Sequence, residues 1–224
     1  MTLAFALEHK IAPSTMLPAK PVVFVVDDDI SVRESLELLI RTAGWRPELF
    51  ASARAFIDHP PTSVPNCLVL DISLPGLNGL ELQKRIVAER PEMPIIFITG
   101  HGDVPKTVQA MKAGAVEFLT KPFPDDLLLD AIRQALERSR SFLAHAAEMQ
   151  SLQDRYASLT PREQQVMKLV VTGLLNKQVG GELEISEITV KAHRGKVMQK
   201  MQANSLADLV KMASKLQMDS RPKT

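Results

Sequence analysis

The feature that most constrains the fold is an alternation of apolar runs and amphipathic segments over residues 21–138. Continuous β-branched runs such as "VVFVV" (22–26) are typical of strands that are buried on both faces of a sheet. Between the runs, apolar residues recur at steps of three and four, as in segment 31–43, which stops at Gly44. This alternation predicts a parallel sheet with helices on both faces.

Five strands and five helices are predicted in this region. The predicted strands are 22–26, 46–50, 67–71, 94–100 and 115–121. The predicted helices are 31–43, 54–58, 80–88, 104–113 and a last one that opens near residue 124. The expected fold class is therefore a doubly wound α/β domain with a five-stranded parallel sheet.

Three consecutive carboxylates follow the first predicted strand: Asp27, Asp28 and Asp29. Like charges this close repel one another unless something compensates them. A capped helix would explain one of them, as the N-cap, and a second could be solvated. Three carboxylates at the end of a buried strand suggest a cation site, and in a parallel sheet such a site lies outside the carboxyl ends of the strands.

The ends of three other predicted strands carry side chains of matching chemistry. Asp71 ends the third strand, Thr99 lies at the end of the fourth and Lys121 ends the fifth. Each has an ordinary explanation, as a turn residue, a β-former and a solvated lysine respectively. Their joint occurrence with Asp27 and Asp28 at one sheet edge is improbable by chance, so we predict a single site there.

The distribution of charge predicts a second domain. Residues 159–224 hold 11 Lys/Arg and 6 Asp/Glu, whereas the residues before them hold 16 and 20. A basic C-terminal part is suited to a polyanion. Its first helix is predicted from "LTPRE", in which Thr160 is the N-cap, Pro161 the first helical residue and Glu163 the partner that completes a capping box.

Three more short helices follow in the basic part. Asn176, Ser186 and Asn204 are the predicted N-caps of these helices. The helix after Ser186 runs to about Met201, and its core face is expected to hold Val190 and Val197. Four short helices predict a compact all-α domain with a central helix-turn-helix. Neither glycine nor proline occurs between Pro124 and Thr160, so the connection is predicted to be helical.

The single cysteine, Cys67, excludes a disulfide framework and a cysteine-ligated metal site, and its apolar surroundings favour a buried structural thiol. No apolar run approaches the ~20 residues that span a bilayer. The N-terminal "MTLAFALEHK" has no basic region of the kind that opens a signal peptide. A cytoplasmic protein with no membrane partner is expected.

The motifs "VVDDD", "DISLPGLNG", "FITGHGD" and "AVEFLTKPF" closely resemble the CheY-like receiver domain of two-component response regulators, over about residues 21–138. The resemblance implies a flavodoxin-like fold in which Asp71 accepts a phosphoryl group from a sensor histidine kinase. It implies Mg²⁺ as the cofactor, held by Asp27, Asp28, Asp71 and the backbone carbonyl of Ser73. Thr99 and Lys121 would contact the phosphoryl oxygens.

The same resemblance implies a conformational switch and a dimer. Phe118 matches the position of the family's aromatic switch, whose ring turns inward when Thr99 moves to the phosphoryl group. Lys121–Pro122 matches a peptide bond that is commonly cis, and Ser73 and His101 match positions that tune the phosphoryl lifetime. Phosphorylation would favour a homodimer through the helix 104–113 and the strand 116–119.

Residues 158–215 resemble the LuxR-type output domain of the NarL/FixJ class, through "LTPREQQVMKLVVTGLLNKQV", "ISEITVKAHRGKVMQKM" and "SLADLVKMA". The predicted organisation is a tail (1–20), a receiver domain (21–138), a helical linker (139–157), a helix-turn-helix domain (158–218) and a tail (219–224). The residues expected to contact DNA are Lys191, Ala192, His193, Arg194, Gly195, Lys196 and Gln199.

The sequence therefore predicts a regulator of transcription that binds double-stranded promoter DNA under the control of phosphorylation. RNA polymerase is a further expected partner, and the only chemistry expected is the chain's own phosphoryl transfer and dephosphorylation, not that of an enzyme. An adaptor whose basic helix docks a protein remains an alternative, which the Asp71, Thr99 and Lys121 set disfavours. A haloacid-type phosphatase is disfavoured because Ser73 stands where its second catalytic aspartate is expected.

Overall fold

The computed structural model describes residues 20–100 and 104–216. The expectations for the two tails, apart from Lys20, and for His101 lie outside these ranges. The chain divides into an N-terminal unit, Met1–Leu143, and a C-terminal unit, Ala144–Thr224. Each unit has its own hydrophobic core and is described by itself.

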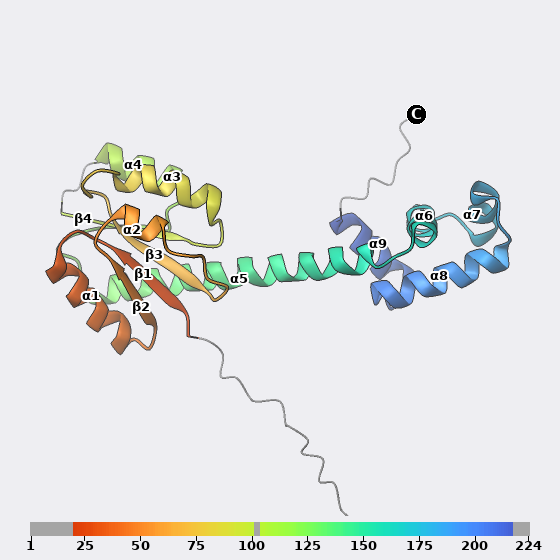
Figure 1. The fold of residues 1–224 in the computed structure, drawn as a ribbon, viewed down its shortest axis with the longest axis horizontal. Helices are drawn as coiled ribbons and strands as arrows, with labels where there is room; N and C mark the ends of the chain where they lie inside the picture. Colours follow the sequence, from red (N-terminus) through yellow and green to blue (C-terminus); the bar gives the residue numbers. More distant parts are fainter. Residues whose placement is uncertain (1–19, 101–103, 217–224) are drawn as a thin grey trace, which may run out of the picture. The chain divides into compact units, whose positions relative to one another are not determined.

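The N-terminal unit is built on a parallel sheet with the strand order β2-β1-β3-β4-β5 (Figure 1). The five strands in the described residues are β1 (Val22–Val26), β2 (Arg46–Phe50), β3 (Asn66–Asp71), β4 (Ile95–Thr99) and β5 (Glu117–Thr120). The predicted fold class is confirmed. The fifth strand is shorter than the predicted 115–121, because its pairing with β4 runs only from Glu117 to Thr120.

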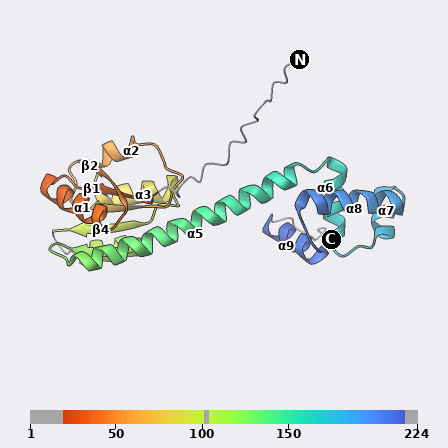
Figure 2. The same ribbon diagram turned by 90° about the horizontal axis from the view of Figure 1, so that it is seen from below.

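Helices cover both faces of this sheet, as Figures 1 and 2 show. One face packs against α1 and α5 through side chains such as Ile40 and Ile132. The other packs against α2, α3 and α4 through Phe56, Leu82 and Ala110. The helices are α1 (Ile30–Thr42), α2 (Ala53–Ile57), α3 (Gly79–Glu89), α4 (Val104–Lys112) and α5 (Asp125–Ala157).

Helix α5 also covers the residues that were expected to form a helical linker. One polar residue on its buried face, Ser139, is fully buried and accepts a hydrogen bond from the backbone N–H of Asn66 at 3.0 Å. Asn66 opens β3, so this bond joins α5 to the first residue of a central strand. A buried polar group needs such a partner, which explains a serine among apolar neighbours.

The C-terminal unit packs four short helices and the end of α5 around one core. The four are α6 (Pro161–Val170), α7 (Asn176–Leu183), α8 (Glu187–Met201) and α9 (Leu206–Lys215). The capping box of Thr160 and Glu163 and the N-cap Ser186 are confirmed. Val190 and Val197 are buried, as the periodicity of α8 predicts.

Two predicted N-caps in this unit are wrong. The N-cap of α7 is Leu175, and Asn176 is the first helical residue. The side-chain oxygen of Asn176 accepts a hydrogen bond from Arg194 at 3.1 Å, while Gln178 accepts the Leu175 backbone N–H. Helix α9 is capped by Ser205 instead of Asn204, because the Ser205 hydroxyl accepts the N–H of Asp208.

Two expectations drawn from composition can be compared with the fold. Cys67 is fully buried in β3, and burial raises the pKa of its thiol, as expected of a structural cysteine. None of the helices in residues 20–100 and 104–216 combines the length and apolar character that crossing a membrane requires.

An ion pair with a buried carboxylate joins the first helix of the C-terminal unit to α8. Glu163 is 3% exposed, and its carboxylate accepts hydrogen bonds from Lys200 at 2.6 Å and from the Thr160 backbone N–H at 2.9 Å. The Lys200 ammonium, followed by the Thr160 N–H, holds the pKa of Glu163 below its usual range. A carboxylate with a lowered pKa stabilises the folded state above the ordinary carboxyl pKa, and this contribution is lost as the pH falls through the lower value.

Glu163→Gln is therefore expected to destabilise the C-terminal unit at pH 7 by ~1.5–3 kcal/mol, the range for hydrogen bonds to charged groups. Its stability should also vary less than that of the wild type between about pH 5 and pH 3, around the ordinary carboxyl pKa. Urea unfolding followed by the fluorescence of Tyr156, the only tyrosine in the chain, measures both effects. Glu81→Gln, at an exposed capping box in α3, is the control; equal pH dependence in wild type and Glu163→Gln would contradict the prediction.

Candidate functional site

Three carboxylates meet at the carboxyl-terminal edge of the sheet. Asp27 and Asp28 directly follow β1, and Asp71 is the last residue of β3. One carboxylate oxygen from each lies within 4.8 Å of those of the other two. Asp27 is fully buried and Asp71 is 6% exposed, whereas Asp28 is exposed. The structure therefore brings together the acidic residues that the sequence placed in one site.

The positive charge that offsets these carboxylates comes from Lys121, which lies at the same edge but on the β5 side of the sheet. It follows β5, and its ammonium nitrogen lies 2.7 Å from Asp27 Oδ2 and 3.7 Å from Asp71 Oδ2. The Lys121–Pro122 peptide bond is cis, as the resemblance implies. Because β5 and β1 are separated by two strands, this ion pair connects distant parts of the sheet edge.

The three consecutive aspartates have different surroundings. Asp29 is the N-cap of α1, and its side chain accepts the backbone N–H of Ser31 at 2.8 Å. Asp27 Oδ1 accepts the backbone N–H of Asp29 at 2.9 Å. Arg33 in the first turn of α1 donates to the backbone carbonyl of Asp27 at 2.7 Å. Sequence reasoning missed Arg33, for which the only local signal is a basic residue one turn after the N-cap.

Asp71 is held in a partly desolvated position. Its Oδ1 accepts the backbone N–H of Ser73 at 3.2 Å. Burial raises the pKa of the Asp71 carboxyl; the nearby Asp27 and Asp28 charges add to this, while the Ser73 N–H and Lys121 oppose it. A cation bound between the carboxylates would relieve the same repulsion. Ser73 contacts Asp71 through its backbone N–H. The expected role of the Ser73 carbonyl as a metal ligand stays a prediction.

The donor set fits a hard divalent cation. Mg²⁺ prefers oxygen ligands and keeps several water molecules, so two or three carboxylates and a carbonyl suffice. Three carboxylate oxygens within 4.8 Å of one another match this requirement. In the described residues, no other cluster of three His, Cys, Asp or Glu side chains has this arrangement. The site can therefore bind a divalent metal.

Thr99 and Phe118 lie on the neighbouring strands β4 and β5. Thr99 is the last residue of β4 and is 1% exposed, and its carbonyl accepts the backbone N–H of Lys121 at 2.7 Å. Phe118 in β5 is half-buried, and its ring centroid lies 6.3 Å from that of Phe97. Their expected movement on phosphorylation stays a prediction.

Helix α8 presents a second candidate site, in the C-terminal unit. Lys191, Ala192, Gly195, Lys196 and Gln199 are exposed, opposite the buried stripe of the helix. Ile188, one turn earlier on the same side, is 82% exposed. His193 and Arg194 are half-buried, and Arg194 is bound to Asn176 at 3.1 Å. Exposed lysines around small side chains suit a helix that enters the major groove of DNA.

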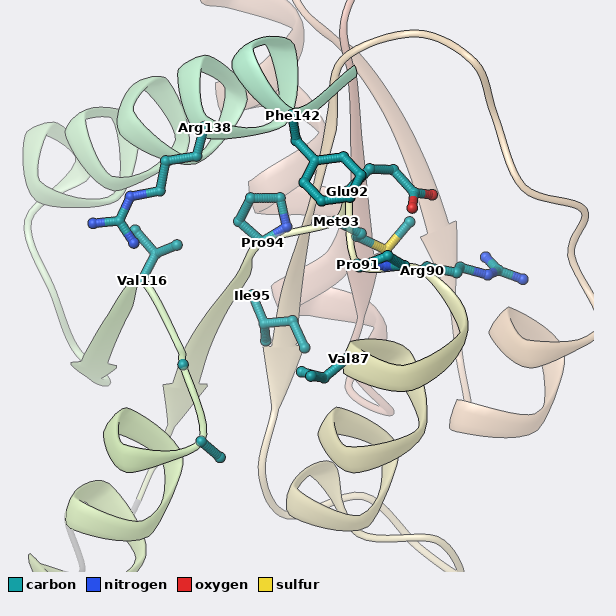
Figure 3. A pocket seen from close by; sticks show the side chains of 12 residues that line it. Val87, Arg90, Pro91, Glu92, Met93, Pro94, Ile95, Val116, Arg138 and Phe142 are labelled. Atoms are coloured by element: carbon teal, nitrogen blue, oxygen red, sulfur yellow. The ribbon is translucent and has the colours of Figure 1, made fainter. Parts of the chain in front are cut away.

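Two hollows in the N-terminal unit differ in their relation to the acidic site. One is a cavity of about 290 Å³ near the amino-terminal edge of the sheet. Its lining residues, among them Val87, Pro94 and Phe142, are drawn in Figure 3, and none of them belongs to the acidic site. The other, of about 330 Å³, lies between α1 and the segment after β5, and its lining includes Lys121. Only the second is positioned to receive a molecule that approaches the carboxylates.

Comparison with known families covers both units. The family model described as "Response regulator receiver domain" matches residues 23–133, and the one described as "Bacterial regulatory proteins, luxR family" matches residues 157–213. The first match contains every residue of the acidic site, and the second contains all of α8.

Individual relatives match most of the chain. Nodulation protein W of Bradyrhizobium diazoefficiens is 52% identical over 202 residues, which are 90% of this chain and 89% of that protein. The transcriptional regulatory protein FixJ of the same species is 46% identical over 191 residues, 85% of this chain and 93% of that protein. The low-resolution structure of the response regulator StyR has a TM-score of 0.81 and 51% identity, and the match covers 88% of this chain and all of that one, 100%.

Gly79 is a further residue of the acidic site that sequence reasoning missed. It opens α3, and a Cβ there would lie 2.6 Å from the Asp71 carbonyl oxygen and 2.9 Å from Ile72 Cα. Because both are backbone atoms, Gly79→Ala should displace the end of β3, destabilise the N-terminal unit by ~1–3 kcal/mol and weaken Mg²⁺ binding. Urea unfolding followed by Trp45 fluorescence and an Mg²⁺ titration measure the two effects.

Gly100→Ala is the matched control, because a Cβ at Gly100 meets no atom within 4 Å and the residue lies at the same sheet edge. It should leave both measurements close to wild type. Unchanged stability and Mg²⁺ affinity in Gly79→Ala would show that the β3–α3 junction yields to a methyl group, contrary to the prediction.

Proposed function

The chain belongs to the NarL/FixJ class of two-component response regulators, which join a receiver domain to a LuxR-type DNA-binding domain, and we propose that phosphorylation of Asp71 controls its binding to promoter DNA. The observation that carries the proposal is the position of Asp71, beside two further carboxylates and 3.7 Å from the Lys121 ammonium. The partner that phosphorylates it would be a sensor histidine kinase. The boundaries proposed for the two domains are 21–138 and 158–218, with the linker 139–157 between them.

In the proposed reaction a carboxylate oxygen of Asp71 attacks the phosphorus of a phosphohistidine on the kinase. The new P–O bond forms as the P–N bond breaks, and the imidazole leaves and takes up a proton. Mg²⁺, held by Asp27, Asp28, Asp71 and the Ser73 carbonyl, would neutralise charge on the transferred group. Lys121 would place its ammonium against a phosphoryl oxygen, and the Thr99 hydroxyl would donate to another. Loss of the group to water would be the chain's only other reaction.

The hollow between α1 and the segment after β5 supports this approach of the kinase. Its lining combines apolar side chains, Val32, Leu36, Leu39, Pro122 and Phe123, with the polar residues Ser31, Ser35, Lys121 and Asp125. An apolar hollow with polar residues at its edge suits a partner that must bring a histidine ring to Asp71.

We further propose that phosphorylation favours a homodimer through α4 and β5. The apolar side chains Val104, Val108 and Met111 are exposed on α4, Val104 to 72%. Strand β5 lies at one edge of the sheet. In this proposal Thr99 moves to the phosphoryl group and the Phe118 ring turns inward, which reshapes the face that these residues form. Taking such an equilibrium from 1:99 to 99:1 requires ~5.5 kcal/mol.

The proposed DNA contact is the exposed face of α8. Ala192 and Gly195 let the helix backbone approach the groove floor, and Gln199 can reach a base edge. Lys191 and Lys196 would contact phosphates or bases from the two sides, while His193 would contact backbone phosphate. The bond of Arg194 to Asn176 makes Arg194 a support of the surface as well as a phosphate contact. The regulator would act in the cytoplasm and there contact RNA polymerase.

Asp71→Asn is expected to abolish the phosphoryl adduct without loss of folding, since the amide keeps the volume and removes a charge that burial disfavours. Incubation with Mg²⁺ and a small phosphoryl donor, followed by intact-mass measurement, gives the result. Asp58→Asn, at an exposed aspartate paired with Arg54, is the control and should be labelled like wild type. A full adduct on the Asp71→Asn protein would refute the assignment.

Light scattering on the same samples tests the dimer. Wild type and Asp58→Asn should double in mass at micromolar concentration when phosphorylated, whereas Asp71→Asn should stay monomeric. Phosphorylated wild type with an unchanged mass would contradict dimerisation without affecting the assignment of Asp71.

Ala192→Glu is expected to abolish selective DNA binding, because it sets a carboxylate against the groove. Lys196→Ala should weaken binding to all duplexes and lower the salt slope by ~1. Fluorescence anisotropy over a salt series, with duplexes that wild type selects from a random pool, measures both. Ala207→Glu makes the same change at an exposed position of α9; if both glutamate variants behave alike, another face of the unit meets DNA.

A further inference from the structure

The last turns of α5 are part of the C-terminal unit. Leu152 is 2% exposed in the core of this unit, and Tyr156 packs against the same core. Glu148 on α5 pairs with Lys215 on α9 at 2.5 Å. The segment that precedes the helix-turn-helix is therefore packed into the unit that carries the DNA-contacting helix, where it can act on that helix directly.

Arg155 on these turns contacts the carboxyl-terminal end of α8. Its guanidinium Nη1 donates to the backbone carbonyl of Met201 at 3.0 Å, and its Nε donates to the Ser151 carbonyl at 3.3 Å. Met201 is the last residue of α8. The last carbonyls of a helix have no partner within the helix, and the negative end of the helix dipole favours a cation there. Arg155 supplies both the missing donor and the positive charge.

A second contact joins the same end of α8 to the start of α6. Lys200 donates to the Ser158 carbonyl at 3.1 Å and to the buried Glu163 carboxylate at 2.6 Å. The last turn of α8 is therefore attached to the segment 155–163 by two basic side chains, one from each partner. The C-cap residue Gln202 follows them in the left-handed region, with a φ of 57°.

We infer that Arg155 is a positioning residue for DNA recognition: from the last turns of α5 it fixes the end of α8, and with it the register of the exposed face of α8 in the major groove. This inference rests on the proposed DNA-binding function. According to this inference, a residue that lies outside the DNA-contacting face influences which DNA sequence is bound. Phosphate contacts orient the protein, but base contacts require the helix to keep one register.

The geometry separates this effect from a direct phosphate contact. Two of the nitrogen atoms of Arg155 already donate to carbonyl groups of the chain, and the residue is half-buried. Loss of a phosphate contact would weaken binding to every duplex and lower the salt slope. Loss of a positioning contact lowers the preference for the selected duplex and leaves the salt slope unchanged.

Arg155→Met in the full chain tests the inference, because methionine keeps an unbranched apolar stem and removes every donor. Lys215→Met is the matched control: it removes one positive charge from an ion pair whose two members lie on α5 and α9 and not on α8. Both proteins and wild type are treated with Mg²⁺ and a small phosphoryl donor. Fluorescence anisotropy over a salt series then compares a duplex that wild type selects from a random pool with an unrelated duplex of equal length.

Arg155→Met should lower the preference for the selected duplex by about ten-fold, the factor that corresponds to a single hydrogen bond to a charged group, with an unchanged salt slope. Hydrogen exchange of the amides at the end of α8 should become faster than in Lys215→Met. Wild-type preference in Arg155→Met overturns the inference, and a salt slope lowered by about one reassigns Arg155 to a phosphate contact. If wild type selects no duplex, the proposed function fails and the inference with it.

Arg155→Lys covers the case in which Arg155→Met does not fold. Lysine keeps the charge but has one ammonium in place of the forked guanidinium. A preference of Arg155→Lys for the selected duplex that is weaker than that of wild type, but still present, supports the positioning role. An unfolded Arg155→Met together with full wild-type preference in Arg155→Lys assigns Arg155 to stability alone and overturns the inference.

Discussion

The ion pair between Lys121 and Asp27 is the interaction on which the acidic site depends. Asp27 is fully buried, and the two residues are 94 positions apart in the chain. Burying a carboxylate without a cationic partner is costly, so the position of the end of β1 depends on the Lys121 ammonium, which comes from the segment after β5. The same ammonium lies 3.7 Å from Asp71 Oδ2, so the surroundings of that carboxylate also depend on β5 being in place in the sheet.

Much of this could be predicted because the signals are local. A β-branched run followed by aspartates marks the end of a buried strand wherever it occurs, and parallel strands bring such ends to one edge. Asp27, Asp71 and Lys121 were found in that way. The capping box of Thr160 and Glu163 was found for the same reason, since its members are three residues apart.

The features that sequence reasoning missed depend on partners far along the chain. Asn176 is a good N-cap by type, but Arg194 occupies its oxygen and Gln178 does the capping. Gly79 has the neighbours of an ordinary helix start, and only the packed structure shows that the backbone at Asp71 leaves no room for a Cβ. Composition and periodicity carry no record of such contacts.

Two effects are proposed for this chain: a switch driven by phosphorylation and the positioning of α8 by Arg155. Helix α5 contributes to the hydrophobic cores of both units. It gives Leu128 and Ile132 to the core of the N-terminal unit and Leu152 to that of the C-terminal unit, with no glycine or proline between Pro124 and Thr160 to interrupt it. A single charged hydrogen bond such as that of Arg155 contributes ~1.5–3 kcal/mol. This is below the ~5.5 kcal/mol that an almost complete switch requires. In the mechanism we propose, the Arg155 contact with the end of α8 therefore influences which DNA sequence is recognised. The energy of the switch comes from the phosphoryl contacts and the dimer interface.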